Sequence, residues 1–352
     1  MPNGRWLKTA IRGLGRTLIG LLAALPVAAA AAPAPLPVFL STDVGCEIDD
    51  QWPILHLLTD PRFDLRVIAS AQAPTDSVPA PPAEVSAATA RHIVRDRLQL
   101  ARPPRVVTGS NQPLADGKTP RTSEAADALL ETAASFSPER RLTVLVIGAG
   151  TDVASALLRD PTLASRISIV AMGFRSYADG DEFNIKNDPH AWRIILRSGA
   201  PLAVGDLDVT ARRLSLTREE ASALLKDLGP LGAWLLRDYA RWYERVTKTF
   251  VNFGRPDDPP SWPIWDEIVV GHLLGKTRSE VRPRPLMNDD LKLVPGGEGV
   301  VTWITDVDRD AVFAAFRKSI ASFSRGKRLR TDPCVTIARE EDACWRGAAP
   351  SR

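Results

Sequence analysis

Cysteine and histidine are scarce in this sequence, with 3 and 4 among its 352 residues. Each histidine falls in a segment predicted to be helical, and no two of them are spaced as paired metal ligands would be. We therefore interpret all of them as packing or surface residues: His56, His92, His190 and His272.

The three cysteines give no clear sign of a reactive thiol. Cys46 lies inside an acidic motif with no histidine nearby in sequence, so we interpret it as a small loop residue and not as a nucleophile. Cys334 and Cys344 could close a small loop near the C-terminus in an oxidising compartment. Two unpaired thiols are the alternative, and the spacing alone does not decide between them.

The chain also lacks a large excess of either charge. Its 45 basic and 42 acidic residues give a formal net charge of +3, but residues 1–32 carry Arg5, Lys8, Arg12 and Arg16 and no acid. Without that segment, 41 basic and 42 acidic residues remain, which is a net charge of −1. A nearly neutral chain gives no reason to expect nucleic-acid binding.

Long apolar runs are absent except at the N-terminus. There a basic stretch precedes Leu18–Ala32, and Pro33, Pro35 and Pro37 follow. This order is typical of a secretory signal, so we predict a signal peptide at 1–32 and an exported protein, periplasmic or secreted, with no membrane contact after cleavage. An uncleaved membrane anchor is the alternative, but the apolar run is short for a full span.

Predicted strands and helices alternate along the rest of the chain. Leu142–Ile147 is a continuous run of leucine and β-branched residues, typical of a strand that is buried on both faces. The alternation predicts an α/β fold with a mostly parallel central sheet flanked by helices, a Rossmann-type open sheet. One domain at 33–324 would precede a basic, irregular C-terminal tail at 325–352. The predicted strands are 37–42, 65–70, 105–108, 142–147, 167–172, 202–204 and 299–305, and the predicted helices are 50–59, 85–98, 123–135, 151–158, 189–198, 217–250, 266–274 and 308–322.

Four acids lie within eight residues where the first predicted strand ends and the first helix begins. They are Asp43, Glu47, Asp49 and Asp50, and Asp49 is a candidate N-cap of that helix. Ligands of open α/β sheets bind outside the carboxyl ends of strands. Converging carboxylates repel one another unless a cation is present, and Ca²⁺ or Mg²⁺ suits a carboxylate-rich site. We therefore favour a metal site over a solvated acidic loop.

The run Ser41–Asp50 resembles the N-terminal signature of the nucleoside hydrolase (inosine-uridine-preferring) family, in the subset with two extra residues between the glycine and the paired aspartates. Ile147–Ala154 resembles a later loop of the family, and Glu182–Ala191 is close to its Glu-Phe-Asn-x-x-x-Asp-Pro-Glu-Ala motif. Trp265-Asp266 falls where the family usually has His-Asp. The segments come in the family's order, so the chain is identified as a divergent, exported member.

The resemblance implies an N-glycosidase that cleaves the N-glycosidic bond of a ribonucleoside or a related ribosyl compound, with Ca²⁺ as its cofactor. Asp43 would be the general base that takes a proton from a metal-bound water. The metal ligands implied at the matching positions are Asp43, Asp50, the main-chain carbonyl of Thr151, and Asp266.

The resemblance further implies that Asp49, Glu182 and Asn184 bind the hydroxyls of a small-molecule ribosyl substrate. Asp188 is interpreted as a helix cap and not as a ligand. The segments after the second strand and before Glu182 lack asparagines that the family uses at the sugar. Their loss motivates a second hypothesis, a catalytically degenerate, calcium-dependent ribose- or sugar-binding protein. Assembly into a homo-oligomer is left open.

A third hypothesis is a phosphohydrolase of the haloacid-dehalogenase type, which also carries acids after a first strand. That chemistry needs an aspartate nucleophile where this chain has Ser41. We therefore rank it below the other two.

Overall fold

The structure, a computed structural model, describes residues 34–75, 80–249 and 260–325. The predicted signal peptide at 1–32, Cys334, Cys344 and the predicted tail beyond Arg325 lie outside these residues. Within them, no helix combines the length and the apolar character needed to cross a membrane.

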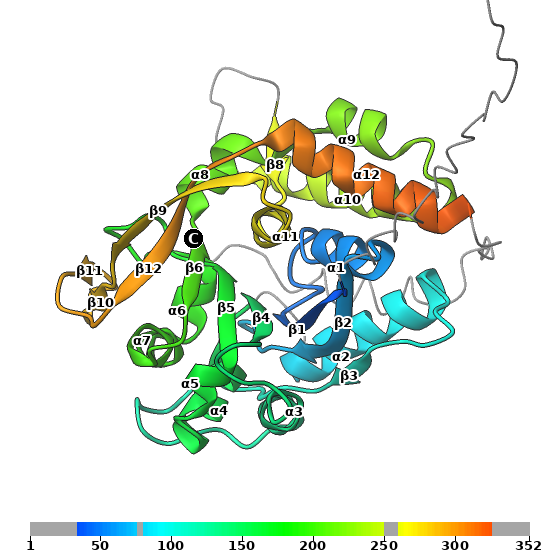
Figure 1. Ribbon diagram of the computed structural model, residues 1–352. Helices are drawn as coiled ribbons and strands as arrows, with labels where there is room; N and C mark the ends of the chain where they lie inside the picture. The colour runs from blue at the N-terminus through cyan, green and yellow to red at the C-terminus, as the bar shows by residue number, and fades with distance from the viewer. Residues whose placement is uncertain (1–33, 76–79, 250–259, 326–352) are drawn as a thin grey trace, which may run out of the picture. The chain divides into compact units, whose positions relative to one another are not determined.

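A central eight-stranded sheet has the order β3-β2-β1-β4-β5-β6-β12-β9 (Figure 1). Neighbouring strands run parallel, except that β9 is antiparallel to β12. The prediction of an α/β fold with a mostly parallel sheet is confirmed. The strands are β1 (Leu36–Thr42), β2 (Phe63–Ser70), β3 (Arg105–Val107), β4 (Leu142–Ile147), β5 (Ile167–Met172), β6 (Leu202–Gly205), β9 (Thr277–Pro283) and β12 (Val300–Val307); β7 (Ser215–Thr217) pairs with β8 (Ser261–Pro263), and β10 (Leu286–Met287) with β11 (Leu293–Val294).

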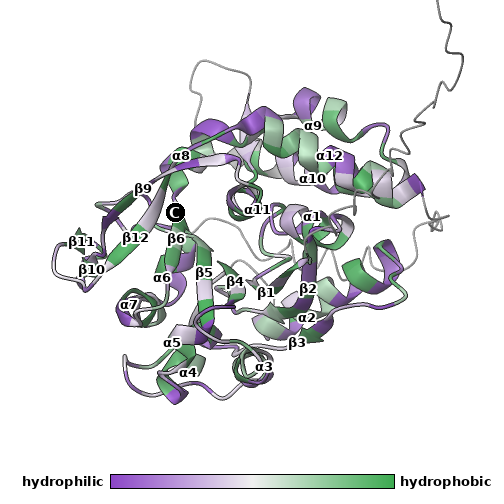
Figure 2. Ribbon diagram, viewed as in Figure 1, coloured by the Kyte–Doolittle hydropathy of each residue, from purple (hydrophilic) through white to green (hydrophobic). Residues whose placement is uncertain are grey.

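Helices cover both faces of the sheet, and each face has its own apolar core. Figure 2 shows the middle strand β5 as largely apolar, as expected of a strand enclosed between two helical layers. One face carries α1 (Gln51–Thr59), α2 (Pro82–His92), a π-helical turn η1 (Ile93–Arg97), α8 (Leu207–Arg213), α9 (Arg218–Leu225), α10 (Gly229–Thr249), α11 (Glu267–Leu273) and α12 (Arg309–Arg325); the other carries α3 (Glu124–Ala133), α4 (Thr151–Arg159), α5 (Leu163–Arg166), α6 (Phe183–Asn187) and α7 (Pro189–Arg197).

Some predicted elements differ from the observed ones. The single helix expected at 217–250 is two helices separated by a turn at 226–228, and Gly229 at the start of the second has a left-handed φ of 67°. The helix expected at 85–98 starts earlier, at Pro82, and its last turn is π-helical. Helix α8 and strand β9 were not predicted, because neither shows a strong apolar pattern in the sequence.

The chain order of the strands reverses at β1 and β4. From β1 the sheet grows outward through β2 and β3, and from β4 it grows the other way through β5 and β6. The two strands pair so that Thr42 lies opposite Ile147 at their carboxyl ends. A reversal of this kind opens a crevice outside the strand ends, which is where open α/β sheets bind ligands.

Candidate functional site

Asp43 is the first residue after β1 and lies at this crevice. It is buried, and Gly148 follows β4 directly beside it. A Cβ atom at Gly148 would lie 3.1 Å from the Asp43 nitrogen and 3.2 Å from its Oδ1. The absence of a side chain at Gly148 is therefore what lets the Asp43 carboxylate approach the end of β4.

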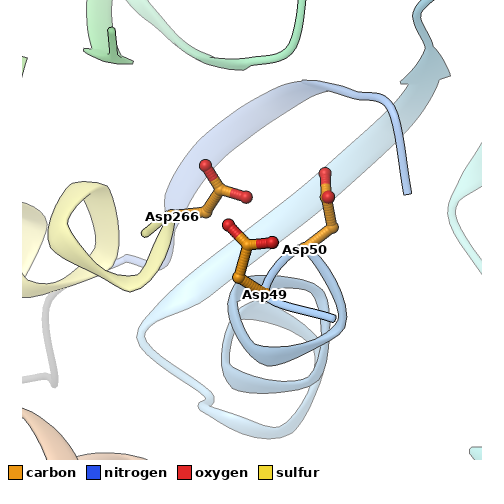
Figure 3. Close-up of side chains that lie close together, drawn as sticks. All are labelled: Asp49, Asp50 and Asp266. Carbon is orange, nitrogen blue, oxygen red and sulfur yellow. The ribbon is translucent and has the colours of Figure 1, made fainter. Parts of the chain in front are cut away.

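Three further aspartates meet next to Asp43, although one of them comes from far along the chain. One carboxylate oxygen from each of Asp49, Asp50 and Asp266 lies within 4.8 Å of the others, and all three side chains are buried. Figure 3 shows Asp49 and Asp50 at the start of α1 and Asp266 at the start of α11, with the carboxylates of Asp49 and Asp266 directed toward each other. The fold thus assembles an acidic cluster from two helix N-termini.

The prediction that Asp49 caps the first helix is wrong. Asp50 occupies the N-cap position of α1, and Asp266 occupies that of α11, but neither side chain accepts a hydrogen bond from its own helix. An N-cap aspartate normally accepts one from the N–H two or three residues on. Here Thr42 Oγ1 donates to Asp50 Oδ1 instead, and both carboxylates are directed into the cluster.

The electrostatics of the cluster are unfavourable without a cation. Burial, followed by repulsion from Asp49, raises the pKa of Asp43 well above its ordinary value. Burial and then repulsion from Asp43 do the same to the pKa of Asp50. Burial raises the pKa of Asp49 to about 6, and a hydrogen bond from Asp266 partly offsets that rise. Burial, followed by repulsion from Asp49 and Asp50, likewise raises the pKa of Asp266 well above its ordinary value, and a cation would relieve this repulsion.

Glu47 extends the acidic cluster. Glu47 is half-buried, and burial, then repulsion from Asp49 and Asp43, raises its pKa well above the ordinary value. Its Oε2 is buried without a hydrogen-bond partner in the part of the chain that the structure describes, while its carboxylate accepts a hydrogen bond from Trp265. The sequence placed Glu47 in the acidic motif but assigned it no role; its position in the two-residue insertion was the available signal.

Glu182 and Asn184 lie at the start of α6, at the edge of the same cluster. Glu182 caps this helix by accepting from the Ile185 N–H at 3.1 Å, and burial raises its pKa to about 7. Its carboxylate is close enough to Asp43 to raise the pKa of that residue. Asn184 donates from Nδ2 to the Met172 carbonyl at 3.3 Å. Both side chains are buried, and Glu182 lies near Asp43; their assignment to the sugar stays a prediction.

Thr151 is placed differently from the aspartates. It is the first residue of α4, and its carbonyl oxygen accepts from Ser155 Oγ at 2.8 Å. Its hydroxyl donates to Asp188 Oδ2 at 2.7 Å. Asp188 caps α7 by accepting from the Ala191 N–H at 2.9 Å, as predicted. The assignment of the Thr151 carbonyl to a metal stays a prediction.

The donor set suits a hard divalent cation. Oxygen atoms of carboxylates are the ligands that Ca²⁺ and Mg²⁺ prefer, and none of the chain's histidines, all of which lie in helices, belongs to the cluster. Two of the three aspartates forgo the capping bond that would otherwise satisfy them. The arrangement of these three aspartates can hold a cation.

Comparisons with known proteins agree with this geometry. The family model described as "Inosine-uridine preferring nucleoside hydrolase" matches residues 38–314. A pyrimidine-specific ribonucleoside hydrolase, RihA, of Escherichia coli O127:H6 is 29% identical over 309 residues, covering 78% of this chain and 94% of that protein. An uncharacterized protein of Schizosaccharomyces pombe is 28% identical over 206 residues, and the match spans 54% of this chain and only 64% of that relative.

Among solved structures, a purine-preferring ribonucleoside hydrolase from Gardnerella vaginalis has the same fold, with a TM-score of 0.66 at 19% identity; the match covers 83% of this chain and 100% of that one. The phosphohydrolase hypothesis has no support from these matches. Since the family model covers most of the chain, the protein belongs to the inosine-uridine preferring nucleoside hydrolase family, whose members are hydrolases acting on N-glycosyl bonds.

Proposed function

We propose that the protein is a metal-dependent hydrolase that cleaves the N-glycosidic bond of a ribonucleoside or a related ribosyl compound. Family membership supports the reaction. The observation that carries the metal is the pair Asp50 and Asp266, two N-cap aspartates that leave their helices uncapped and meet Asp49 within 4.8 Å. Such an arrangement costs stability unless a cation compensates the charge.

The proposed cofactor is Ca²⁺. Asp50 and Asp266 would hold it, with Asp43 and the Thr151 carbonyl as the further ligands that the family positions imply. Asp49, which we expected only at the sugar, lies close enough to join them. When bound, the cation would supply coordination positions for a water molecule and for ribose hydroxyls, and would lower the pKa of that water.

Asp43 is the proposed general base. In its buried setting without a cation its pKa is raised, by burial first, and a protonated carboxyl cannot accept a proton. Positive charge nearby favours the ionised form. Ionised Asp43 would take one proton from the attacking water as the C1′–O bond forms, while the C1′–N bond breaks and its electron pair leaves with the nitrogen.

Glu182 and Asn184 are the proposed sugar-binding residues, together with Asp49. Both lie at the N-terminus of α6, and Glu182 is near enough to Asp43 to affect its ionisation. Hydrogen bonds from ribose hydroxyls to these oxygens would orient the anomeric carbon toward the water. Buried carboxylates also stabilise the positive charge of an oxocarbenium-like transition state.

The test is a nucleoside panel assayed with Ca²⁺ and with a chelator. The related proteins carry names that specify pyrimidine and purine nucleosides, so the panel includes both. We expect base release that the chelator abolishes. A folded protein that binds no divalent cation contradicts the mechanism. Calcium-dependent ribose binding without product from any nucleoside would instead support the degenerate sugar-binding protein.

We also propose that the chain is exported and that residues 1–32 are removed. The basic stretch and apolar run of the sequence support this proposal. N-terminal sequencing of the mature protein tests it, since a start near residue 33 is expected and an intact Met1 on an unprocessed chain contradicts it.

A further inference from the structure

A buried histidine and a buried glutamate connect the two helices that carry the acidic cluster. His56 lies in α1, after Asp50, and Glu267 is the first residue of α11, directly after Asp266. His56 Nδ1 and Glu267 Oε1 are hydrogen-bonded, and both side chains are 0% exposed. The bond therefore joins the two halves of the site across 211 positions of the sequence.

Stability alone explains this pair poorly. Glu267 Oε2 has no hydrogen-bond partner in the described ranges, and His56 Nε2 has only a distant neighbour, Asp60 Oδ2 at 3.9 Å. The ring of His56 packs edge-on against Phe316, with 5.5 Å between the ring centroids. Apolar residues of similar volume are often as stable as a buried ionisable pair, and sometimes more so. The pair therefore calls for a role beyond holding the core together.

We propose that the His56–Glu267 pair is a positioning element that sets the separation of Asp50 and Asp266. Neither residue of the pair would touch the cation or the substrate. Because Glu267 directly follows Asp266, a shift of α11 along α1 moves the Asp266 carboxylate by a comparable distance. Ligand distances in a metal site tolerate only about 0.2 Å, so fixing α11 controls the affinity of the cluster for its cation.

This inference rests on the proposed function, because it requires a divalent cation at the cluster. Calorimetric titration of Ca²⁺ into metal-free protein tests both. For the double variant His56→Leu/Glu267→Leu we expect binding weakened about tenfold or more. The unfolding midpoint of the metal-free double variant should be unchanged or higher. A wild-type protein that binds no cation overturns both proposals, whereas a double variant that binds as tightly as wild type overturns only this one.

A matched control is His92→Leu. His92 Nδ1 pairs with Asp96 Oδ2 at 2.8 Å, so this substitution also removes a histidine–carboxylate pair, but one that is not part of the cluster. Its Ca²⁺ affinity should stay within about twofold of wild type. An equal loss of Ca²⁺ affinity in this control would mean that removing any histidine–carboxylate pair disturbs the site. That result would overturn the positioning role.

Two single variants test the positioning role even if the double variant His56→Leu/Glu267→Leu does not fold. Glu267→Gln keeps the length and the hydrogen bond to His56, and its Ca²⁺ affinity should stay within about threefold of wild type. Glu267→Asp keeps the charge but shortens the side chain by one methylene, so we expect it to bind Ca²⁺ more weakly than Glu267→Gln does. The reverse order would mean that the charge of Glu267 acts directly on the cation, and would refute the positioning role.

Discussion

Two pairs of buried aspartates occupy helix N-cap positions in this fold and use their carboxylates in opposite ways. Asp188 and Asp206 cap α7 and α8 through their side chains. Asp50 and Asp266 occupy the same position in α1 and α11 without forming that bond. Because all four lie at a helix start, proximity to an N-terminus does not explain the difference.

The difference lies in what surrounds each carboxylate. Asp206 Oδ1 accepts from the Val209 N–H at 2.8 Å, and its Oδ2 accepts from Trp303 Nε1 at 2.7 Å, so both oxygens have a donor. The carboxylates of Asp50 and Asp266 face other carboxylates. The first pair stabilises the fold, whereas under the proposed function the second is available for a cation at the expense of stability. Substitution of Asp188 or Asp206 should therefore lower the stability of the fold, whereas substitution of Asp50 or Asp266 should weaken cation binding.

The largest effect should come from Asp43→Asn, which removes the proposed base. An amide cannot accept the proton from water, so we expect kcat to fall about 10²- to 10⁴-fold. Base release with saturating Ca²⁺ measures this. The metal-free variant should be at least as stable as wild type, because a buried carboxyl with a raised pKa has been neutralised. Retention of more than about a tenth of the activity would rule out the assigned role.

The next effect should come from the double variant Asp50→Asn/Asp266→Asn. Losing two carboxylate ligands should weaken Ca²⁺ binding about 100-fold or more, since charge count sets the affinity of such sites. Without the cation, the variant should be more stable than wild type by about 1 kcal/mol, because mutual repulsion is relieved. Calorimetry and urea unfolding provide the two values. A loss of metal-free stability would mean that these aspartates act as ordinary caps.

Asp206→Ala should give the opposite pattern. Two hydrogen bonds to a buried carboxylate are lost, so the free energy of unfolding should fall by about 2–3 kcal/mol. The Ca²⁺ affinity of the folded variant should stay within about twofold of wild type, because Asp206 is not part of the cluster. Weakened Ca²⁺ binding in a stable variant would remove the distinction between the two pairs.

A smaller, pH-dependent effect should follow from Asp152→Asn. Oδ1 of this buried residue accepts from the Ser110 N–H at 3.0 Å and from Ser123 Oγ at 2.6 Å, but Oδ2 has no partner among the residues described. Burial raises the Asp152 pKa to about 6. Its protonated form therefore favours folding below pH ~4, and that contribution is lost as the pH rises through about 6.

The asparagine variant should consequently match wild type in stability near pH 4 and exceed it by about 2–3 kcal/mol at pH 8. Urea unfolding at both pH values is the measurement. A difference that is the same at the two pH values would mean that Asp152 does not titrate in the folded protein.

The core of the fold could be predicted from the sequence because its strands are apolar on both faces. The observed bounds of β4 and β5, Leu142–Ile147 and Ile167–Met172, are those predicted from the sequence. Strand β9 was missed for the converse reason. Most of its residues are exposed, and it forms a strand through its backbone pairing with β12, which leaves no apolar pattern.

The site could be predicted only in part. Asp43, Asp49 and Asp50 are close in sequence at a strand end, so local spacing indicated that their side chains converge. Asp266 could be added only through the family motif, because nothing local distinguishes it from a surface acid. Which aspartate occupies the N-cap position, and whether its carboxylate bonds to the helix, depends on neighbours brought together by folding.

The two edge strands of the central sheet, β3 and β9, affect how this protein associates with other chains. Open sheet edges carry unpaired backbone groups that attract strands from other chains. Here β3 is only three residues long, and β9 places Arg278, Glu280 and Arg282 around Val281, which is 71% exposed. Shortness at one edge and charge at the other both oppose strand addition. The outermost strands should therefore protect the protein against aggregation at high concentration.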